Sequence, residues 1–293
     1  MVFAEISNEM NLPVGYALLM NIVGLLLIFT GAVVYRKMLR ETVRSGGHVR
    51  GDLLGLPDTL VAGTLATLFI TLIVSQWVMP VAASSGHAPP GSPQSANGLK
   101  IIYEALAFAL PIGAIIVLLI VRGVSIVTLF GLKRVGLVRA ICTAAVLLLL
   151  LLPLLFVIMN VTGHLLGGHA EQQTLVKTYR EAAKAGRSEI IWQVIVTAVV
   201  IAPICEEILF RGYFYPTLKR VVGPVPAALG ISLLFALVHN SAVGFPVLTV
   251  LALGFTLAYE WSGSIFIPIF MHAWFNAANL ALMWWQTPQG ATP

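Results

Sequence analysis

Long runs of apolar residues dominate the sequence and limit what the chain can fold into. Five of them approach the ~20 residues that a helix needs to cross ~30 Å of hydrocarbon, and three later runs follow, two of them short. The runs cover residues 14–34, 60–79, 101–121, 140–161 and 190–209, and then 225–239, 245–260 and 265–285. Of the 293 residues only 10% are charged, against about 25% in a typical soluble domain. The sequence therefore predicts an all-α, polytopic transmembrane bundle of about eight helices.

Basic residues in two loops predict the orientation of this bundle, because cytoplasmic loops carry an excess of Lys and Arg. We expect these two loops to be cytoplasmic and the N-terminus to lie outside, in the plasma (inner) membrane if the source is bacterial. This asymmetry and attraction to anionic lipid headgroups explain the net charge of +5, so the lipid bilayer is the expected partner and nucleic acid is not. The basic residues are Arg36, Lys37, Arg40, Arg44 and Arg50 after the first run, and Arg122, Lys133, Arg134 and Arg139 after the third.

Two other segments differ from the apolar runs. Residues 80–100 are rich in Pro, Ser, Gly and Ala, which predicts a flexible extracytoplasmic loop. Residues 162–189 mix basic and acidic side chains with a weak apolar stripe, which predicts a short helix lying on the membrane surface. Its basic residues oppose the orientation inferred above. The first apolar run is expected to remain in the mature protein, because residues 1–13 lack the basic region of a signal peptide.

Charged residues inside the fifth apolar run are the strongest functional signal. An ionisable side chain within a transmembrane helix is expensive and marks a functional site by default. Residues four apart on a helix share a face, whereas residues five apart do not. Glu207 therefore faces Arg211, and we expect this pair to offset the cost of two buried charges. Glu206 is left free on an adjacent face.

A histidine is expected at the same depth as Glu206. Glu206 lies fourteen residues before Arg220, where the helix should end with at most a kink at Pro216, and His239 lies sixteen residues after the turn at Gly223. At 1.5 Å per residue both lie roughly 20–24 Å from that turn. An antiparallel hairpin would place the two side by side, as a candidate acid–base pair. A structural histidine is the alternative.

The last apolar run contributes two further polar side chains, His272 and Asn276. They are four residues apart, so they project from one face, and both can present N–H donors to a developing oxyanion. A simple hydrogen bond between helices would explain them as well. Counted from the turn at 261–263, His272 should lie nearer the cytoplasm than His239 by on the order of 10 Å. Tilt of the helix or a bend at Pro268 would have to close that gap.

Three ordered patterns in these segments resemble those of a known family. They are EEILFR (residues 206–211), FALVH (residues 235–239) and HAWFN (residues 272–276). Together they are similar to the Glu-Glu-x-x-x-Arg, Phe-x-x-x-His and His-x-x-x-Asn motifs of the type II CAAX prenyl proteases, also called the Abi or CAAX-protease and bacteriocin-processing (CPBP) family. The resemblance covers about residues 190–285. It divides the chain into N-terminal transmembrane helices with loops and a surface helix (1–189) and a catalytic core (190–293).

The resemblance implies an intramembrane endopeptidase with a polar cavity between its helices. In the family's proposed mechanism, Glu206 and His239 would activate a water that attacks the scissile carbonyl. His272 and Asn276 would stabilise the oxyanion. Glu207 and Arg211 would hold the site together, and Phe235 would pack against His239 or line the cavity as a substrate-binding residue.

Zinc at the same residues is an alternative. Glu206, His239 and His272 could bind Zn²⁺ as a His₂Glu set with water as the fourth ligand. The His-Glu-x-x-His spacing of many zinc proteases is absent, however, and an Asn beside the second His suits hydrogen bonding better than ligation. We therefore expect a site that needs no metal.

The substrate and the alternatives to an enzyme stay open. The substrate is expected to be a peptide or lipidated protein in the membrane, but no residue specifies recognition of a prenyl chain. A non-catalytic scaffold or bacteriocin self-immunity protein could use the same polar cluster to bind a peptide. A transporter is a third possibility, although paired broken helices are not evident. Glu260, near the end of a run, is expected to be solvated.

Overall fold

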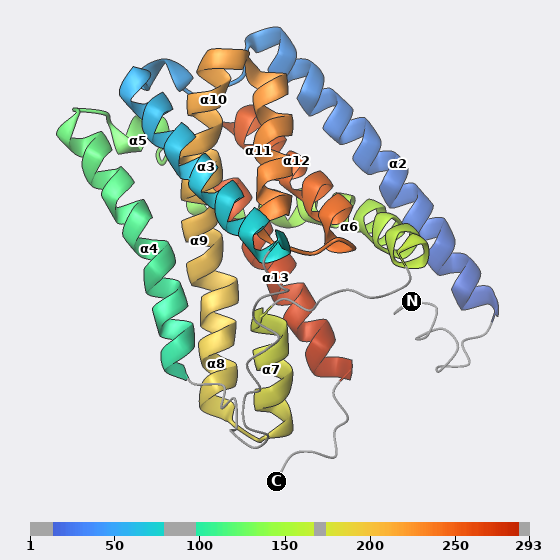
Figure 1. Cartoon of the computed structure of the whole chain (residues 1–293). Helices are drawn as coiled ribbons and strands as arrows, with labels where there is room; N and C mark the ends of the chain where they lie inside the picture. The colour runs from blue at the N-terminus through green and yellow to red at the C-terminus, as the bar shows by residue number, and fades with distance from the viewer. Residues whose placement is uncertain (1–13, 79–97, 167–173, 287–293) are drawn as a thin grey trace.

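The chain folds as a bundle of helices (Figure 1). The computed structural model describes residues 14–78, 98–166 and 174–286, and the regular structure of these residues is entirely helical, which confirms the predicted all-α class. The loop predicted at 80–100 lies almost wholly outside them. The helices before residue 188 are α2 (Val14–Ser45), the 3₁₀ turn η1 (Gly51–Leu53), α3 (Leu56–Val78), α4 (Gly98–Val121), α5 (Ile126–Leu129), α6 (Leu137–Leu165) and α7 (Thr174–Lys184). Those after it are α8 (Ser188–Val196), η2 (Thr197–Ile201), α9 (Ala202–Glu207), η3 (Ile208–Phe214), α10 (Tyr215–Val222), α11 (Pro224–Val238), α12 (Gly244–Ser262) and α13 (Phe266–Gln286).

Among the described residues, five helices are long and apolar enough to cross a membrane. Three shorter apolar helices accompany these five. The total matches the eight or so helices that the sequence predicts. The protein is a multi-pass integral membrane protein. The spans are Leu19–Ser45, Leu137–Leu165, Ser188–Val222, Gly244–Ser262 and Phe266–Trp285, and the shorter helices are Leu56–Leu72, Ala109–Val121 and Pro224–Val238.

The hydrophobic core surrounds α12, which packs against α11, α6, α2 and α13. Its residues Ala252, Phe255 and Tyr259 are fully buried. Large apolar side chains such as Leu25 and Leu110 are instead exposed on the outside of the bundle, as expected where lipid replaces water. The core draws on helices from both halves of the chain, and the division at residue 189 stays a prediction.

The helix predicted within residues 162–189 is present as α7. Figure 1 draws it alongside α8, and its Tyr179 and Ala182 are buried against Ile190 and Val194 of α8. These two side chains of α7 therefore contact protein. That this helix lies on the membrane surface stays a prediction.

Residues 188–222 form one continuous helix that contains two π-helical segments, η2 and η3. Each π segment is followed by a proline at the second position of the next α-helical segment, Pro203 and Pro216. Proline has no amide hydrogen and its ring clashes with the carbonyl four residues before it, so widening the preceding turn relieves the clash. The sequence had suggested at most a kink at Pro216.

The turn between α12 and α13 is held by glycine. Gly263 ends α12 in the left-handed conformation, with φ of 65°. Gly131, after α5, lies so close to it that an added Cβ would overlap the carbonyl oxygen of Gly263. The backbone amide of Ile265 donates to the carbonyl of Phe130 at 3.0 Å. This contact fixes where α13 begins, and therefore the position of His272 along the axis of the bundle.

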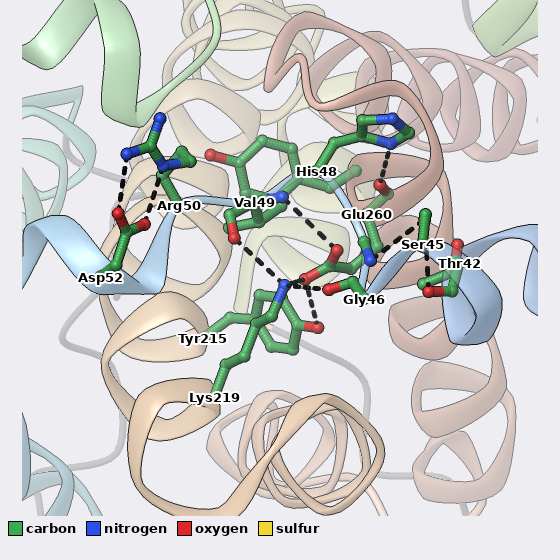
Figure 2. A network of polar contacts seen from close by, with 12 residues as sticks. Thr42, Ser45, Gly46, His48, Val49, Arg50, Asp52, Tyr215, Lys219 and Glu260 are labelled. Atoms are coloured by element: carbon green, nitrogen blue, oxygen red, sulfur yellow. Dashed lines mark hydrogen bonds and ion pairs between the residues drawn. The ribbon is translucent and has the colours of Figure 1, made fainter.

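A buried polar network joins α10 and α12 to the loop after α2 (Figure 2). The Glu260 carboxylate accepts from the Tyr215 hydroxyl at 2.7 Å and from Lys219 Nζ at 2.6 Å. Lys219 Nζ also donates to the carbonyls of Gly46 and Val49, each at 3.1 Å. Glu260 is only 2% exposed, so the prediction of a solvated carboxylate was wrong. The loop folds over the end of α12 and supplies partners in place of water.

Candidate active site

Two oppositely charged side chains form the base of the site. Glu207 and Arg211 are both 0% exposed, and Arg211 Nη1 donates to Glu207 Oε1 at 2.9 Å. Arg211 Nη2 donates to the carbonyl of Ala252 on α12 at 3.1 Å. The pairing predicted from the four-residue spacing is confirmed. The pair matters because a buried charge without a partner is costly. The bond from Arg211 to the Ala252 carbonyl links the helix of residues 188–222 to α12.

Two aromatic rings enclose the guanidinium. Arg211 Cζ lies 4.6 Å from the ring centre of Phe235 and 5.3 Å from that of Phe255. Phe255 also stacks on the His272 ring, with 5.4 Å between centres. It is fully buried and touches two of the predicted site residues. Sequence reasoning missed Phe255 because an aromatic residue in an apolar run gives no functional signal.

Glu206 faces two imidazole rings. Its Oε2 atom lies 3.8 Å from Nε2 of His239 and 3.9 Å from Nε2 of His272. The Glu206 and His239 side chains are 15% and 18% exposed, and that of His272 is 5% exposed. Glu206 Oε2 accepts no hydrogen bond from the described residues. The depth match of Glu206 and His239 is as expected, and the 10 Å offset counted for His272 is closed. Counting residues assumes parallel helices, whereas α13 crosses the bundle obliquely in Figure 1.

The Nδ1 atoms of both imidazole rings have hydrogen-bond partners that define the tautomers. His239 Nδ1 lies 2.7 Å from the carbonyl oxygen of Phe235, and His272 Nδ1 lies 3.0 Å from Glu207 Oε1. Carbonyl and carboxylate oxygens only accept, so each Nδ1 carries the proton. In a neutral ring the Nε2 atom then presents a lone pair toward Glu206. With both rings neutral, the two Nε2 lone pairs and Glu206 Oε2 are three acceptors, with each Nε2 atom within 4 Å of Oε2.

Asn276 donates to an oxygen outside this group of acceptors. Its Nδ2 atom donates to the carbonyl of Ala198 in η2 at 2.7 Å, eight residues before Glu206. One N–H of Asn276 thus has a partner elsewhere, and the predicted convergence of Asn276 and His272 on one point stays a prediction. Its second N–H remains for another acceptor.

Phe235 packs behind the site. It is 1% exposed, and its ring centre lies 4.6 Å from that of His239 and 5.9 Å from that of His272. Of the two roles expected for Phe235, packing against His239 describes its position, and contact with a substrate stays a prediction.

The donor set of Glu206, His239 and His272 has the chemistry that zinc requires. Each Nδ1 donates to an oxygen, which is the usual second contact of a zinc-binding histidine. Ligands about 2.0–2.1 Å from a tetrahedral zinc lie roughly 3.3 Å apart, whereas the measured separations from Glu206 are 3.8 and 3.9 Å. Within the described ranges, no three His, Cys, Asp or Glu side chains are close enough to hold a metal ion without moving. The residue types fit zinc, and the side chains would have to close by about 0.5 Å.

Comparison with known proteins finds a family that matches this part of the chain. Residues 188–278 match the family described as type II CAAX prenyl endopeptidase Rce1-like, and the six polar candidate residues lie within that range. The chain is also 35% identical over 79 residues to the membrane-embedded CAAX protease MroQ of Staphylococcus aureus (strain USA300). That similarity covers 25% of this chain and 32% of the relative, so it spans about a third of the relative's length. No solved structure matches. The resemblance to the type II CAAX prenyl endopeptidases that the three motifs predicted is therefore confirmed over residues 188–278.

Proposed function

We propose that the protein is an intramembrane endopeptidase that hydrolyses a peptide bond of a membrane-associated substrate. The observation that supports this most is the environment of Glu206. Its neighbour Glu207 is neutralised by Arg211, whereas Glu206 Oε2 accepts no hydrogen bond from the part of the chain that the structure describes and faces two imidazole nitrogens at 3.8 and 3.9 Å. A carboxylate beside histidine in a largely apolar enclosure is suited to remove a proton from water.

In this mechanism Glu206 and His239 hold the attacking water. Water has two hydrogens, and the two acceptors, Glu206 Oε2 and His239 Nε2, can each take one. The oxygen lone pair is then free to attack the carbonyl carbon of the scissile bond. As the new C–O bond forms, one proton passes to the Glu206–His239 pair, which later returns it to the leaving amine when the C–N bond breaks.

His272 and Asn276 are proposed to stabilise the oxyanion. Because His272 Nδ1–H donates to Glu207 Oε1, His272 can also donate from Nε2 only as an imidazolium. Asn276 would donate its second N–H. Removing one such donor from an enzyme commonly lowers kcat by about 10²–10³-fold.

Zinc remains the alternative for the same three residues. If it is bound, Glu206, His239 and His272 would hold it, and the metal would supply Lewis-acid activation of water. We favour the metal-free site because the carboxylate and one imidazole can already take both hydrogens of the water. Assaying the purified enzyme after exhaustive chelation tests this preference. Complete loss of activity that only zinc restores would refute it.

The substrate is proposed to be a peptide or lipidated protein held in the bilayer. The relative's name and the matched family point to CAAX-type C-terminal cleavage. In the test, a strain that lacks the gene is supplied with either the wild-type protein or Glu206→Gln. The membrane proteomes of the two resulting strains are then searched for new C-termini. New termini that require the Glu206 carboxylate would support the proposal and identify the substrate. Identical termini in the two strains, with both proteins present, would contradict it.

The scaffold and self-immunity alternative makes a different prediction for the same strain. A protein that only binds a peptide through the polar cluster should keep its phenotype in Glu206→Gln, because glutamine preserves the shape and most of the hydrogen bonding of the side chain. A protease should lose it.

A further inference from the structure

The structure assigns a positioning role to Pro203, three residues before Glu206: we propose that its missing amide hydrogen frees the Ala198 carbonyl to orient the side chain of Asn276. The inference rests on the proposed function for its effect on catalysis. Its structural part, the coupling of Pro203 to Asn276, can be tested without any activity.

The argument begins with the hydrogen bonds of the η2 segment. A helical carbonyl accepts from the amide four residues later in an α-helix, or five residues later in a π-helix. For Ala198 those amides belong to Ala202 and to residue 203. The Ala202 amide donates to Thr197, and residue 203 is proline, which has none. Neither amide is available to Ala198.

Asn276 takes the place of the missing donor. Ala198 is buried, so a carbonyl left without a partner there would be costly. Asn276 Nδ2 donates to this oxygen at 2.7 Å from the facing helix α13. The bond uses one of the two N–H groups and fixes the plane of the amide. The other N–H then has a defined direction, which is what a preorganised oxyanion donor requires.

The same residue that widens the helix therefore also fixes a side chain on another helix. Replacing Pro203 by alanine supplies an amide hydrogen that can reach the Ala198 carbonyl. Asn276 would then compete with this backbone amide for the Ala198 carbonyl oxygen, and the side-chain amide of Asn276 would rotate. Because alanine also favours a helix far more than proline does, the substitution should not weaken the fold.

The experiment is a double-mutant cycle of Pro203→Ala and Asn276→Ala. The free energy of unfolding of each purified variant is measured in detergent. In the wild-type background, Asn276→Ala leaves the buried carbonyl unpaired and should raise the unfolding equilibrium constant on the order of tenfold. In the Pro203→Ala background the new amide satisfies that carbonyl, so most of the effect should disappear. Pro153→Ala, which changes a proline inside α6, is the matched control and should leave the effect of Asn276→Ala unchanged. Equal effects of Asn276→Ala in all three backgrounds would overturn the inference.

Activity then separates a positioning role from a purely structural one. Pro203→Ala should lower kcat on the order of ten- to a hundredfold with KM little changed, at equal or higher thermal stability, and adding Asn276→Ala should lower it little further. Coupling in stability with normal kcat in Pro203→Ala would refute the positioning role. Failure of Pro203→Ala to fold would also contradict it. If the wild-type protein cleaves no substrate, the proposed function fails, and the stability cycle still decides the coupling.

Discussion

Arg211 offers the most direct test of how the site is held together. Arg211→Met keeps the length and the apolar part of the side chain but removes the charge. Glu207 would then be a carboxylate with 0% exposure and without its cation. Breaking one partner of such a buried pair destabilises a protein by about 3–5 kcal/mol. The carbonyl of Ala252 would still be satisfied, because it also accepts from the Thr256 hydroxyl at 2.9 Å, so the stranded Glu207 carboxylate should dominate the loss.

The partner substitution should reverse much of that loss. In Arg211→Met with Glu207→Gln no charge is left unpaired, and the double variant should be more stable than Arg211→Met by about 2 kcal/mol or more. Unfolding in detergent, followed by tryptophan fluorescence, measures both. Lys37→Met is the matched control, because Lys37 and Glu41 form an exposed pair at the same four-residue spacing, which is worth about 0.5 kcal/mol or less. The reasoning fails if Arg211→Met costs no more than Lys37→Met, or if the double variant is as unstable as Arg211→Met.

Two further tests, with three substitutions, separate the roles of other buried side chains. Phe255→Leu removes the ring that stacks on His272 and should lower kcat about tenfold. Phe214→Leu changes a buried ring away from His272 and should leave kcat of the folded protein unchanged, although both variants should lose about 1–2 kcal/mol of stability. Equal kcat values in the two variants would contradict this role of Phe255. Lys219→Met leaves Glu260 buried beside a neutral side chain and should lower the free energy of unfolding by about 3 kcal/mol without altering kcat. Kinetics of the folded fraction and unfolding curves check both, and a Lys219→Met variant as stable as the wild type would count against the network.

The fold class and the pairing of site residues could be predicted because each depends on local rules. Helices in a bilayer must satisfy their own backbone, so a long apolar run has few alternatives. A spacing of four residues fixes a shared helical face, which is why the contact between Glu207 and Arg211 was predictable. The equal depth of Glu206 and His239 followed from counting along two helices joined by a short turn.

The features that were missed depend on contacts between distant segments. The burial of Glu260 requires the loop after α2 to fold over it, and nothing in the sequence around residue 260 signals that loop. The partner of Asn276 is a carbonyl that is available only because Pro203 follows a π-helical turn. Phe255 acquires its importance only where α12 meets α13 and η3. These contacts are set by how the helices cross, which residue spacing does not reveal.

Cleavage by the purified protein in lipid vesicles, compared between the wild type and Glu206→Gln, tests the central claim most directly. Membrane-anchored peptides with and without a prenyl group would serve as substrates, and mass spectrometry would identify the new C-termini. We expect the wild-type protein to release a defined product and Glu206→Gln to release none while remaining folded and able to bind the peptide. Cleavage by Glu206→Gln at the wild-type rate would contradict the account, because the water would then be activated by some group other than the Glu206 carboxylate.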